Sequence, residues 1–503
     1  MEDPDGDFDS DSANFLAWFV SLPGTTIHPS LRITDLRHRH AGRGMTATTD
    51  VPAGDDLFVI PRSAIISAET SDLVRRIPGL FNRTENHALD QNGRDDEDEL
   101  GDNLHDIPTA WLDLIFILLY EYLHYNTSKW KPYLQVLPAR PGNFNTLMFW
   151  DSNELHELQA SHMTSRIGRS SADTIFRKNV IPLVHEHADI FYPTSTSTRL
   201  TDEELLDLLH SMGSLIMSYA FELQPDDDED EGISDDGDNA QDGWKEDKPK
   251  AGTMGMIPMA DMLNADAEFN AHLSHGDSSL TMTSLGIKAG DEVLNYYGPL
   301  SNGELVRRYG YSSHNHARFD VVELPWALIK STILKAFSNE AEPKQRRLSS
   351  LIQEVEDAND LTNESFVLER DAEGPDDTGH CATPAVFQTP PEELVDIVAT
   401  EILGKLMGKD NNASEQKRRF LTIFNATLKS RLAQFATSVA EDEQLVLQAT
   451  GRLRMAINVR HGEKKLLQEA IDWTELKLRA LMVENNTNDS QDGPPRKRHK
   501  KGT

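Results

Sequence analysis

The sequence has very little cysteine, since Cys381 stands alone among 503 residues. A single thiol excludes an internal disulfide framework and any zinc site built from several cysteines, and it is typical of a reducing compartment. Long hydrophobic runs are also missing, because no stretch approaches the roughly 18 consecutive apolar residues of a membrane-spanning helix. The hydrophobic share of 38% still allows packed cores, and the length predicts two or three domains.

Basic residues are scarce relative to acidic ones, with 49 Lys and Arg against 83 Asp and Glu and a net charge of −34. Direct nucleic-acid binding by the folded body is therefore disfavoured, because phosphate contacts need a basic face. Much of the negative charge lies in the stretches 1–12, 90–102 and 226–247, with net charges of −6, −6 and −11. These acidic stretches predict solvated, disordered segments; a second interpretation is that they attract a basic protein partner.

Several enzyme signatures are missing as well. The chain has no P-loop, no GxGxxG after a predicted strand and no HExxH. His38 and His40 form one close pair and His185 and His187 another, but neither pair has a matching second cluster. Surface histidines are therefore favoured over metal ligands, and a bystander role is favoured for the Cys381 thiol. We predict no metal site.

The first half of the chain predicts short strands and several helices. Short strands with turns are expected over 41–67. Thr201 and Glu204 form a capping-box pattern at the start of one predicted helix. The prolines of WKPYLQVLP are expected to end any helix over 130–138. Apolar spacing predicts helices over 13–22, capped by Asp11 or Ser12, and over 109–125, 153–161, 170–187 and 201–223.

The second half changes character near 320–330, where we place a domain boundary. Before it, 253–325 is compact and rich in turns and short strands. After it, helical runs are expected over 326–337, 390–407, 415–435 and 440–482, with an irregular acidic linker near 354–390. The basic cluster PPRKRHKK at 494–501 predicts a nuclear localisation signal in an otherwise acidic chain.

Three separated segments, 38–61, 254–273 and 289–311, carry residue types suited to ligand binding. Gly42 and Gly44 allow a ligand to approach the backbone closely. Asn264 lies in a turn-prone run, and its amide can both donate and accept hydrogen bonds. The third segment gathers four phenols, those of Tyr296, Tyr297, Tyr309 and Tyr311. Taken singly, each feature is better explained without a ligand, by turn glycines, a turn asparagine and core tyrosines.

Together and in this order, the three segments resemble the SET-domain protein-lysine methyltransferases. The similarity is greatest to the split-SET branch typified by the Rubisco large-subunit methyltransferase, and within it to the ribosomal lysine methyltransferases. The resemblance implies an α+β fold with a β-rich SET core, a pseudoknot-like threading, a helical insertion and an all-α C-terminal substrate-binding domain. The implied boundaries are 13–325 for the split SET domain, about 68–250 for its insertion and 326–485 for the helical domain, with disordered ends at 1–12 and 486–503.

The resemblance also implies a site for S-adenosylmethionine. The family's Asn-His pair is matched by Asn264 and Ala265, so only the backbone of Ala265 could bond the adenine. Tyr297 matches the catalytic tyrosine, which would align a neutral lysine amine with the methyl group. The other implied cofactor contacts are Ala41, Gly42 and Arg43 through backbone groups, and Tyr219 and Tyr309 through side chains; Trp130, Ala220 and Glu222 would lie near the substrate lysine.

The implied activity is methyl transfer from S-adenosylmethionine to a lysine of a basic protein. A large-subunit (60S) ribosomal protein is the expected substrate, and a histone or a nuclear regulator is the alternative. A further alternative is an acidic binding protein without turnover that escorts basic partners, an interpretation favoured by the charge runs and by Ala265. The expected location is the nucleus, with the cytoplasm left open. The target lysine, the number of methyl groups and the oligomeric state are not predicted by the sequence.

Overall fold

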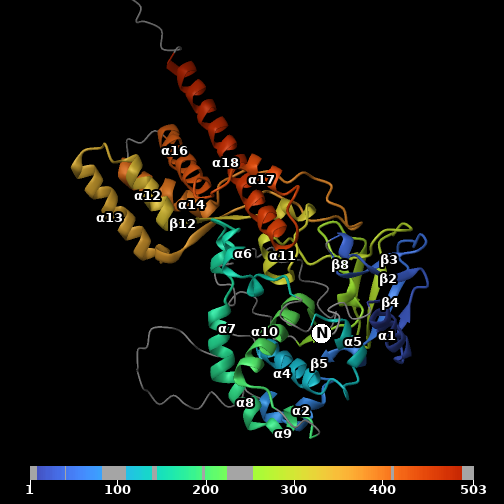
Figure 1. Ribbon diagram of the computed structural model, residues 1–503. Helices are drawn as coiled ribbons and strands as arrows, with labels where there is room; N and C mark the ends of the chain where they lie inside the picture. Colours follow the sequence, from blue (N-terminus) through green and yellow to red (C-terminus); the bar gives the residue numbers. More distant parts are fainter. Residues whose placement is uncertain are drawn as a thin grey trace, which may run out of the picture.

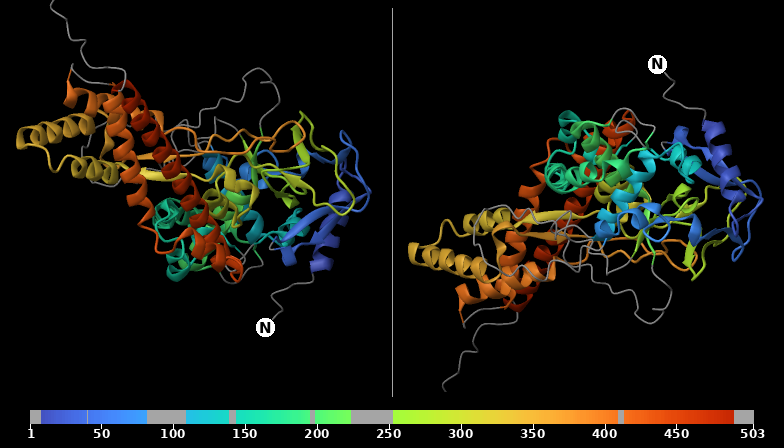
Figure 2. Two further views of the ribbon diagram at one scale, coloured as in Figure 1. Left: turned by 90° about the horizontal axis from the view of Figure 1, so that it is seen from above. Right: turned by 90° about the horizontal axis from the view of Figure 1, so that it is seen from below.

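The computed structural model describes residues 8–39, 41–81, 109–138, 144–194, 199–223, 253–408 and 413–489 (Figure 1). The acidic stretches 90–102 and 226–247 and the basic cluster 494–501 lie outside these residues, as does most of 1–12. Most of the strands gather at one end of the molecule and the C-terminal helices at the opposite end, as two further views show (Figure 2). No described helix is long and apolar enough to cross a membrane.

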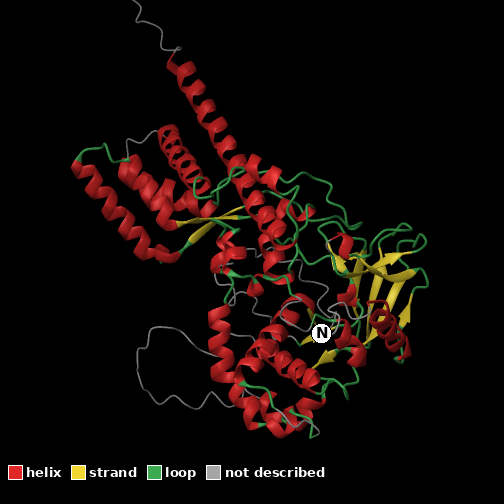
Figure 3. Cartoon of the chain, viewed as in Figure 1, coloured by secondary structure: helices red, strands yellow, loops and turns green. Residues whose placement is uncertain are grey.

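The β-rich part is made of several small sheets rather than one large one (Figure 3). Its largest sheet has the order β1-β4-β10-β9, and every strand in it is antiparallel to its neighbours. In β10 every second residue is buried, as expected of a sheet with one face on the core. The strands are β1 Thr26–Ile27, β2 Leu31–Asp35, β3 Arg43–Ala47, β4 Asp56–Pro61, β5 Ile66–Ser67, β6 Ala220–Glu222, β7 Met254–Met256, β8 Asn264–Ala265, β9 Ala271–His275, β10 Ser279–Ser284 and β11 Leu294–Asn295.

Backbone pairing brings the three motif segments together. The amide of Val293 donates to the carbonyl of Met45 at 2.7 Å, so the third segment lies beside β3. In β11, Leu294 pairs in parallel with Asn264 of β8. The third segment therefore lies between the first and the second, although more than 200 residues separate β3 from β8. The pseudoknot-like threading implied for this region stays a prediction.

The helical insertion packs its most apolar helix, α4, at its centre. Nine of the ten positions 112–121 on α4 are buried, which explains why its sequence is apolar on every face. The predicted capping box is confirmed, because the Thr201 hydroxyl and the Glu204 carboxylate bond reciprocally at the start of α10. The helices are α2 Asp72–Arg76, α3 Pro78–Phe81, α4 Thr109–Leu123, α5 Lys131–Val136, α6 Ser152–His156, α7 Arg169–Ile175, the π-helix η7 Phe176–Val180, α8 Ile181–Glu186, α9 Ala188–Phe191 and α10 Asp202–Tyr219.

Two expectations for the helices near the N-terminus are wrong. Helix α1 spans Phe8–Ser21, so Asp11 and Ser12 lie inside it and cap nothing. The Ser12 hydroxyl donates instead to the carbonyl of Phe8 at 2.7 Å, one turn earlier. Helix α5 forms where prolines were expected to prevent it, because Pro132 lies in the first turn, where a backbone N–H has no partner within the helix.

The C-terminal part is helical apart from one strand, β13 Ser365–Leu368, which pairs antiparallel with β12 Val322–Pro325. This strand corrects the expectation of an all-helical region and of an irregular linker over 354–390; α13 also reaches Ala358. Phe366 and Leu368 are buried while Val367 is exposed, an alternation too short to recognise in the sequence. The helices are α11 Asn302–Tyr309, α12 Trp326–Ala336, α13 Glu342–Ala358, α14 Glu392–Val395, the π-helix η11 Asp396–Gly404, α15 Lys405–Met407, α16 Ala413–Leu432, α17 Val439–Leu445 and α18 Gly451–Asp489.

The α+β fold class is confirmed, and buried apolar residues form separate cores in its two halves. One core joins the strands and the insertion, and a second joins β12, β13 and the C-terminal helices. A small third core connects the halves, where Met455 and Val459 of α18 meet Trp150, Leu158 and Val306. Helix α18 therefore contributes to both the second and the third core.

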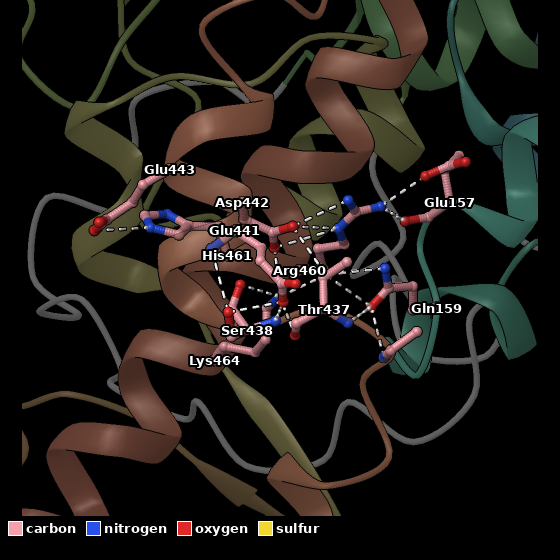
Figure 4. Close-up of polar contacts among 11 residues, drawn as sticks. Glu157, Gln159, Thr437, Ser438, Glu441, Asp442, Glu443, Arg460, His461 and Lys464 are labelled. Atoms are coloured by element: carbon pink, nitrogen blue, oxygen red, sulfur yellow. Dashed lines mark hydrogen bonds and ion pairs between the residues drawn. The ribbon is translucent and has the colours of Figure 1, made fainter.

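A buried charge cluster reinforces this connection (Figure 4). The Arg460 guanidinium donates to Asp442 of α17 at 3.0 Å and to Glu157 after α6 at 2.8 Å. The Lys464 ammonium lies 2.5 Å from the other Asp442 oxygen. Arg460, Lys464 and Asp442 are almost completely buried. Burial alone would raise the pKa of Asp442, but hydrogen bonds from Arg460 and Lys464 hold it below its usual range.

A second buried group, Glu463, lies on the same helix and predicts a loss of stability at alkaline pH. The Ser161 hydroxyl donates to one Glu463 oxygen, and the other oxygen has no hydrogen-bond partner among the described residues. Burial raises the pKa of Glu463 to about 8. In the folded chain the carboxyl therefore keeps its proton up to that pH, whereas the unfolded chain releases it near its ordinary value of 4.5. Its contribution to stability is fully present below that value and is lost as the pH rises through about 8.

We expect the free energy of unfolding to fall between pH 7 and pH 9, with Glu463 contributing about 1.4 kcal/mol of the fall. Urea denaturation of the wild-type chain and of Glu463→Gln, at both pH values, measures this contribution. The variant carries no titrating group at this position, so its decrease should be smaller than that of the wild type. An equal decrease in the two proteins would show that Glu463 titrates normally.

Candidate active site

Asn264 joins the first and second motif segments. Its side-chain amide, at the start of β8, donates to the carbonyl of Arg43 at 3.3 Å and to the Glu292 carboxylate at 2.6 Å. Burial raises the pKa of Glu292 even though Asn264 donates to it. Gly44 makes this approach possible, because a Cβ there would lie 2.8 Å from the Asn264 amide nitrogen and 2.9 Å from Glu292 Oε1.

Gly42 differs from Gly44 in facing open space. A Cβ at Gly42 would meet no atom within 4 Å among the described residues. The surrounding backbone is nevertheless fixed, since the Leu36 amide donates to the Gly42 carbonyl at 3.0 Å and the Leu36 carbonyl accepts from the Ala41 amide at 3.2 Å. The backbone of segment 41–43 is thus fixed by hydrogen bonds to Leu36 and has one uncovered side, which fits its predicted role in lining a ligand.

The two glycines give a matched pair of substitutions. We expect Gly42→Ala to leave the thermal midpoint of unfolding almost unchanged and to weaken binding of S-adenosylmethionine about tenfold, because the added methyl group would lie on the uncovered side. Gly44→Ala should lower the midpoint, since its Cβ collides with protein atoms. Calorimetric titration and thermal unfolding of both variants test this. Unchanged cofactor affinity in Gly42→Ala would show that segment 41–43 does not line the cofactor site.

Tyr297, Tyr309 and Tyr311 form a cluster beside Asn264. The rings of Tyr297 and Tyr309 stack with centroids 4.5 Å apart, and Tyr311 meets Tyr309 edge-on at 6.3 Å. The Tyr297 hydroxyl donates to the carbonyl of Leu263 at 3.1 Å, and that of Tyr311 to the carbonyl of Ala265 at 3.0 Å. Burial raises the pKa of Tyr297 well above its usual range, so the phenol stays a neutral hydrogen-bonding group at physiological pH.

Tyr219 and Arg43 complete the polar part of the site. Tyr219 ends α10, and burial, with the charge of Asp261, raises its pKa to about 12. The Arg43 guanidinium does not face Asn264, because it reaches α1 instead. It donates to the Ser12 hydroxyl at 3.2 Å and lies 4.4 Å from the centroid of the Phe8 ring. The backbone of Arg43 thus contacts Asn264 while its side chain holds α1.

Of the predicted substrate residues, Trp130 lies in the hydrophobic core, and Ala220 and Glu222 lie on β6 after Tyr219. Trp130 is 2% exposed, and its indole N–H donates to the carbonyl of Ala64 at 2.8 Å, within the hydrophobic core. Ala220 follows Tyr219 directly and pairs with Met256, whereas Glu222 is exposed at the end of β6. Their contact with a substrate lysine stays a prediction.

Three polar residues at the site were missed by the sequence analysis. Glu292 accepts from Asn264, and Asp261 accepts from the hydroxyl of Tyr133. The only available signal was the position of Asp261, a carboxylate inside the apolar run MIPMADML and three residues before Asn264. Among the described residues, no group of three or more His, Cys, Asp or Glu side chains is placed to hold a metal ion.

The comparison with known proteins begins with the C-terminal helices, where residues 385–467 match the family model described as "Rubisco LSMT substrate-binding". Ribosomal lysine N-methyltransferase 4 of Saccharomyces cerevisiae is 30% identical over 368 residues, covering 72% of this chain and 68% of the yeast protein. The chain belongs to the Rubisco LSMT-like SET-domain protein-lysine methyltransferases. The resemblance seen in the three motif segments is therefore confirmed.

This methyltransferase has further relatives along most of its length. Human N-lysine methyltransferase SETD6 is 26% identical, covering 86% of this chain and 85% of the human one. Two solved structures share the fold across nearly the whole chain. The first is "Crystal structure of the SET domain of LSMT bound to Lysine and AdoHcy", with a TM-score of 0.58, 18% identity and 98% of both chains covered. The second is "Structure of Rubisco LSMT bound to AdoMet", with a TM-score of 0.56, 17% identity and 97% of both chains covered.

Proposed function

We propose that this protein-lysine methyltransferase uses S-adenosylmethionine to methylate a lysine of a large-subunit ribosomal protein. The observation that carries the proposal is the meeting of the three motif segments at two adjacent residues. Asn264 bonds to the backbone of Arg43, and the Tyr297 hydroxyl bonds to the carbonyl of Leu263. A cofactor-binding backbone and a catalytic phenol are thereby held within one small region.

The residues present fit the cofactor. The uncovered side of Gly42 leaves room beside a fixed backbone, and the Ala265 backbone lies on β8 next to Asn264. When bound, S-adenosylmethionine supplies a methyl group carried on a positively charged sulfonium. The Gly42 segment and Asn264 would hold the cofactor, and the ring of Tyr309, stacked on Tyr297, would cover it.

The tyrosine cluster suits the demands on the substrate amine. Aromatic surroundings lower the pKa of a lysine amine by desolvating its charged form, which favours the neutral nucleophile. The Tyr297 hydroxyl, kept protonated by burial, would orient that amine through a hydrogen bond rather than act as a base. Correct alignment of two reacting groups supplies up to about 7–11 kcal/mol of a barrier, so orientation alone can carry most of the catalysis.

The ribosomal substrate is supported by similarity and by charge. The yeast relative is named as a ribosomal lysine methyltransferase. A net charge of −34 would attract a Lys- and Arg-rich protein by long-range electrostatics. Histones are also rich in Lys and Arg, so they remain the alternative substrate class. We further propose a nuclear location, supported by the basic cluster 494–501.

Methyl transfer to purified proteins tests the proposal. The chain is incubated with labelled S-adenosylmethionine and either 60S ribosomal proteins or core histones, and mass spectrometry then locates the methylated lysine. We expect label in a ribosomal protein and not in the histones. Preferential labelling of histones would show that histones are the substrate class instead. Absence of both cofactor binding and label would overturn the proposal. A chain that binds ribosomal proteins without label would favour the non-catalytic escort.

A further inference from the structure

Asp261 is a carboxylic acid buried beside the proposed catalytic tyrosine. It lies in a single 3-10 turn, η8 Ala260–Met262, three residues before Asn264, and is 6% exposed. The Tyr133 hydroxyl donates to Asp261 Oδ2. The backbone amides of Asp261 and Met259 also stabilise the carboxylate, but burial dominates and raises the pKa of Asp261 to about 8. Burying such a group is costly unless its partners are well oriented.

Tyr133 connects the buried carboxyl to the N-terminal helix. Its side chain comes from α5 and is completely buried. The ring packs against two aromatic residues of α1, with centroids 6.1 Å from Phe15 and 6.4 Å from Trp18. The position of the Tyr133 hydroxyl is therefore fixed by packing before it reaches Asp261. The hydrogen bond between them ties η8 to the packed pair of helices α1 and α5.

The turn that contains Asp261 has a strained backbone. Met259 has a φ of 83°, which is unfavourable for a residue with a side chain. Three hydrogen bonds close the turn. They run from the amides of Asp261, Met262 and Leu263 to the carbonyls of Ile257, Met259 and Ala260, at 3.2, 3.3 and 3.3 Å. Strain of this kind persists only where the surroundings hold the backbone in place.

The strained turn presents the atoms that the site uses. The carbonyl of Leu263, at its end, accepts the hydrogen bond from the Tyr297 hydroxyl. The next residue is Asn264, whose amide bonds to the backbone of Arg43. A shift of the turn would therefore move the acceptor that orients the Tyr297 hydroxyl.

We propose that Asp261 and Tyr133 are positioning residues for methyl transfer, whose buried hydrogen bond fixes the turn 257–263 and thereby the direction of the Tyr297 hydroxyl. Neither residue needs to touch the substrate or the cofactor. The inference rests on the proposed function, because it takes Tyr297 as the catalytic group. The charge of Asp261 also raises the pKa of both Tyr297 and Tyr219, so the carboxyl lies within electrostatic reach of both phenols.

Tyr133→Phe tests the proposal, because it removes the hydroxyl and keeps the ring packed against Phe15 and Trp18. We expect kcat to fall about tenfold, with the Kd for S-adenosylmethionine and the KM for the protein substrate within twofold of wild type. Asp261→Leu, which removes the oxygen that accepts from Tyr133, should lower kcat in the same way. Tyr192→Phe is the matched control, because Tyr192 is a buried tyrosine of the insertion outside the site, and its kcat should be unchanged. An unchanged kcat in Tyr133→Phe would overturn the proposal.

A double substitution separates positioning from general stability. If Tyr133 acts through Tyr297, the pair Tyr133→Phe and Tyr297→Phe should lose no more kcat than Tyr297→Phe alone. Multiplicative losses would mean that the two residues act independently and would contradict the proposal.

Hydrogen exchange supplies a readout that needs no turnover. In Tyr133→Phe, amides within 257–264 should exchange about tenfold faster, while those of the strands β4 and β10 keep their wild-type rates. Unchanged exchange in 257–264 would overturn the proposal even if no substrate is found. Absence of methyl transfer by the wild-type chain, with faster exchange in the variant, would instead count against the proposed function alone.

Discussion

Replacing Tyr297 by phenylalanine is expected to lower kcat by about 10²–10³-fold, the usual loss when one oriented hydrogen-bonding group is removed from an active site. The ring stack with Tyr309 needs no hydroxyl and should survive. The hydrogen bond to the carbonyl of Leu263 would be lost, and with it the group that orients the amine. Because Asn264 and segment 41–43 are untouched, the Kd for S-adenosylmethionine should stay within about twofold of wild type.

Single-turnover kinetics and calorimetric titration of the variant measure the two quantities separately. Tyr296→Phe is the matched control in the neighbouring position. The Tyr296 ring stacks on Phe269 with centroids 5.1 Å apart, and burial raises its pKa to about 12, but it lies outside the cluster around Tyr297. This control should keep most of its activity. A Tyr297→Phe enzyme with wild-type kcat would remove Tyr297 from the mechanism.

Asp442→Ala is expected to lower the free energy of unfolding by about 3–5 kcal/mol. The substitution leaves the Arg460 and Lys464 charges buried without the carboxylate that neutralises them. Such uncompensated charges are far more costly than the loss of an exposed ion pair. The loss should be largest at neutral pH, where Asp442 is ionised in the wild type.

Urea denaturation at pH 7 measures this difference, and Glu443→Gln is the control on the adjacent residue. The Glu443 side chain is half exposed and contacts His461 at 3.5 Å and Lys465 at 3.6 Å. Its removal should change stability little, since exposed ion pairs contribute little. Equal losses in the two variants would show that the buried cluster has no special role in stability.

Local patterns predicted the elements that depend on local physics. The Thr201–Glu204 capping box and the apolar helix α4 were expected from residues close in sequence, and both are present. The start of α1 was missed because Phe8, beyond the recognised apolar spacing, packs against Arg43 of β3. Helix α5 was missed because a proline ends a helix in most positions and begins one in its first turn.

The site was predictable only through the resemblance, since its contacts are long-range. The amide of Asn264 and the carbonyl of Arg43 are 221 positions apart, and Tyr133 and Asp261 are 128 apart. No periodicity or spacing rule connects residues at such separations. The motif segments identified Asn264 and Tyr297. Glu292 gave no signal of its own, because single carboxylates are common on protein surfaces, and Asp261 gave only its position inside an apolar run.

Helix α18 has a consequence for the design of chimeric enzymes. It is one continuous element of 39 residues, and its first turns and its middle serve different partners. Near its start, Arg452 donates to Glu154 at 2.7 Å, whereas Leu467 and Ile471 pack in the second core. A transplant of the C-terminal region between relatives would therefore separate α18 from the residues it packs against, unless residues 144–166 are transplanted with it. The C-terminal helices and residues 144–166 should accordingly be exchanged as one module.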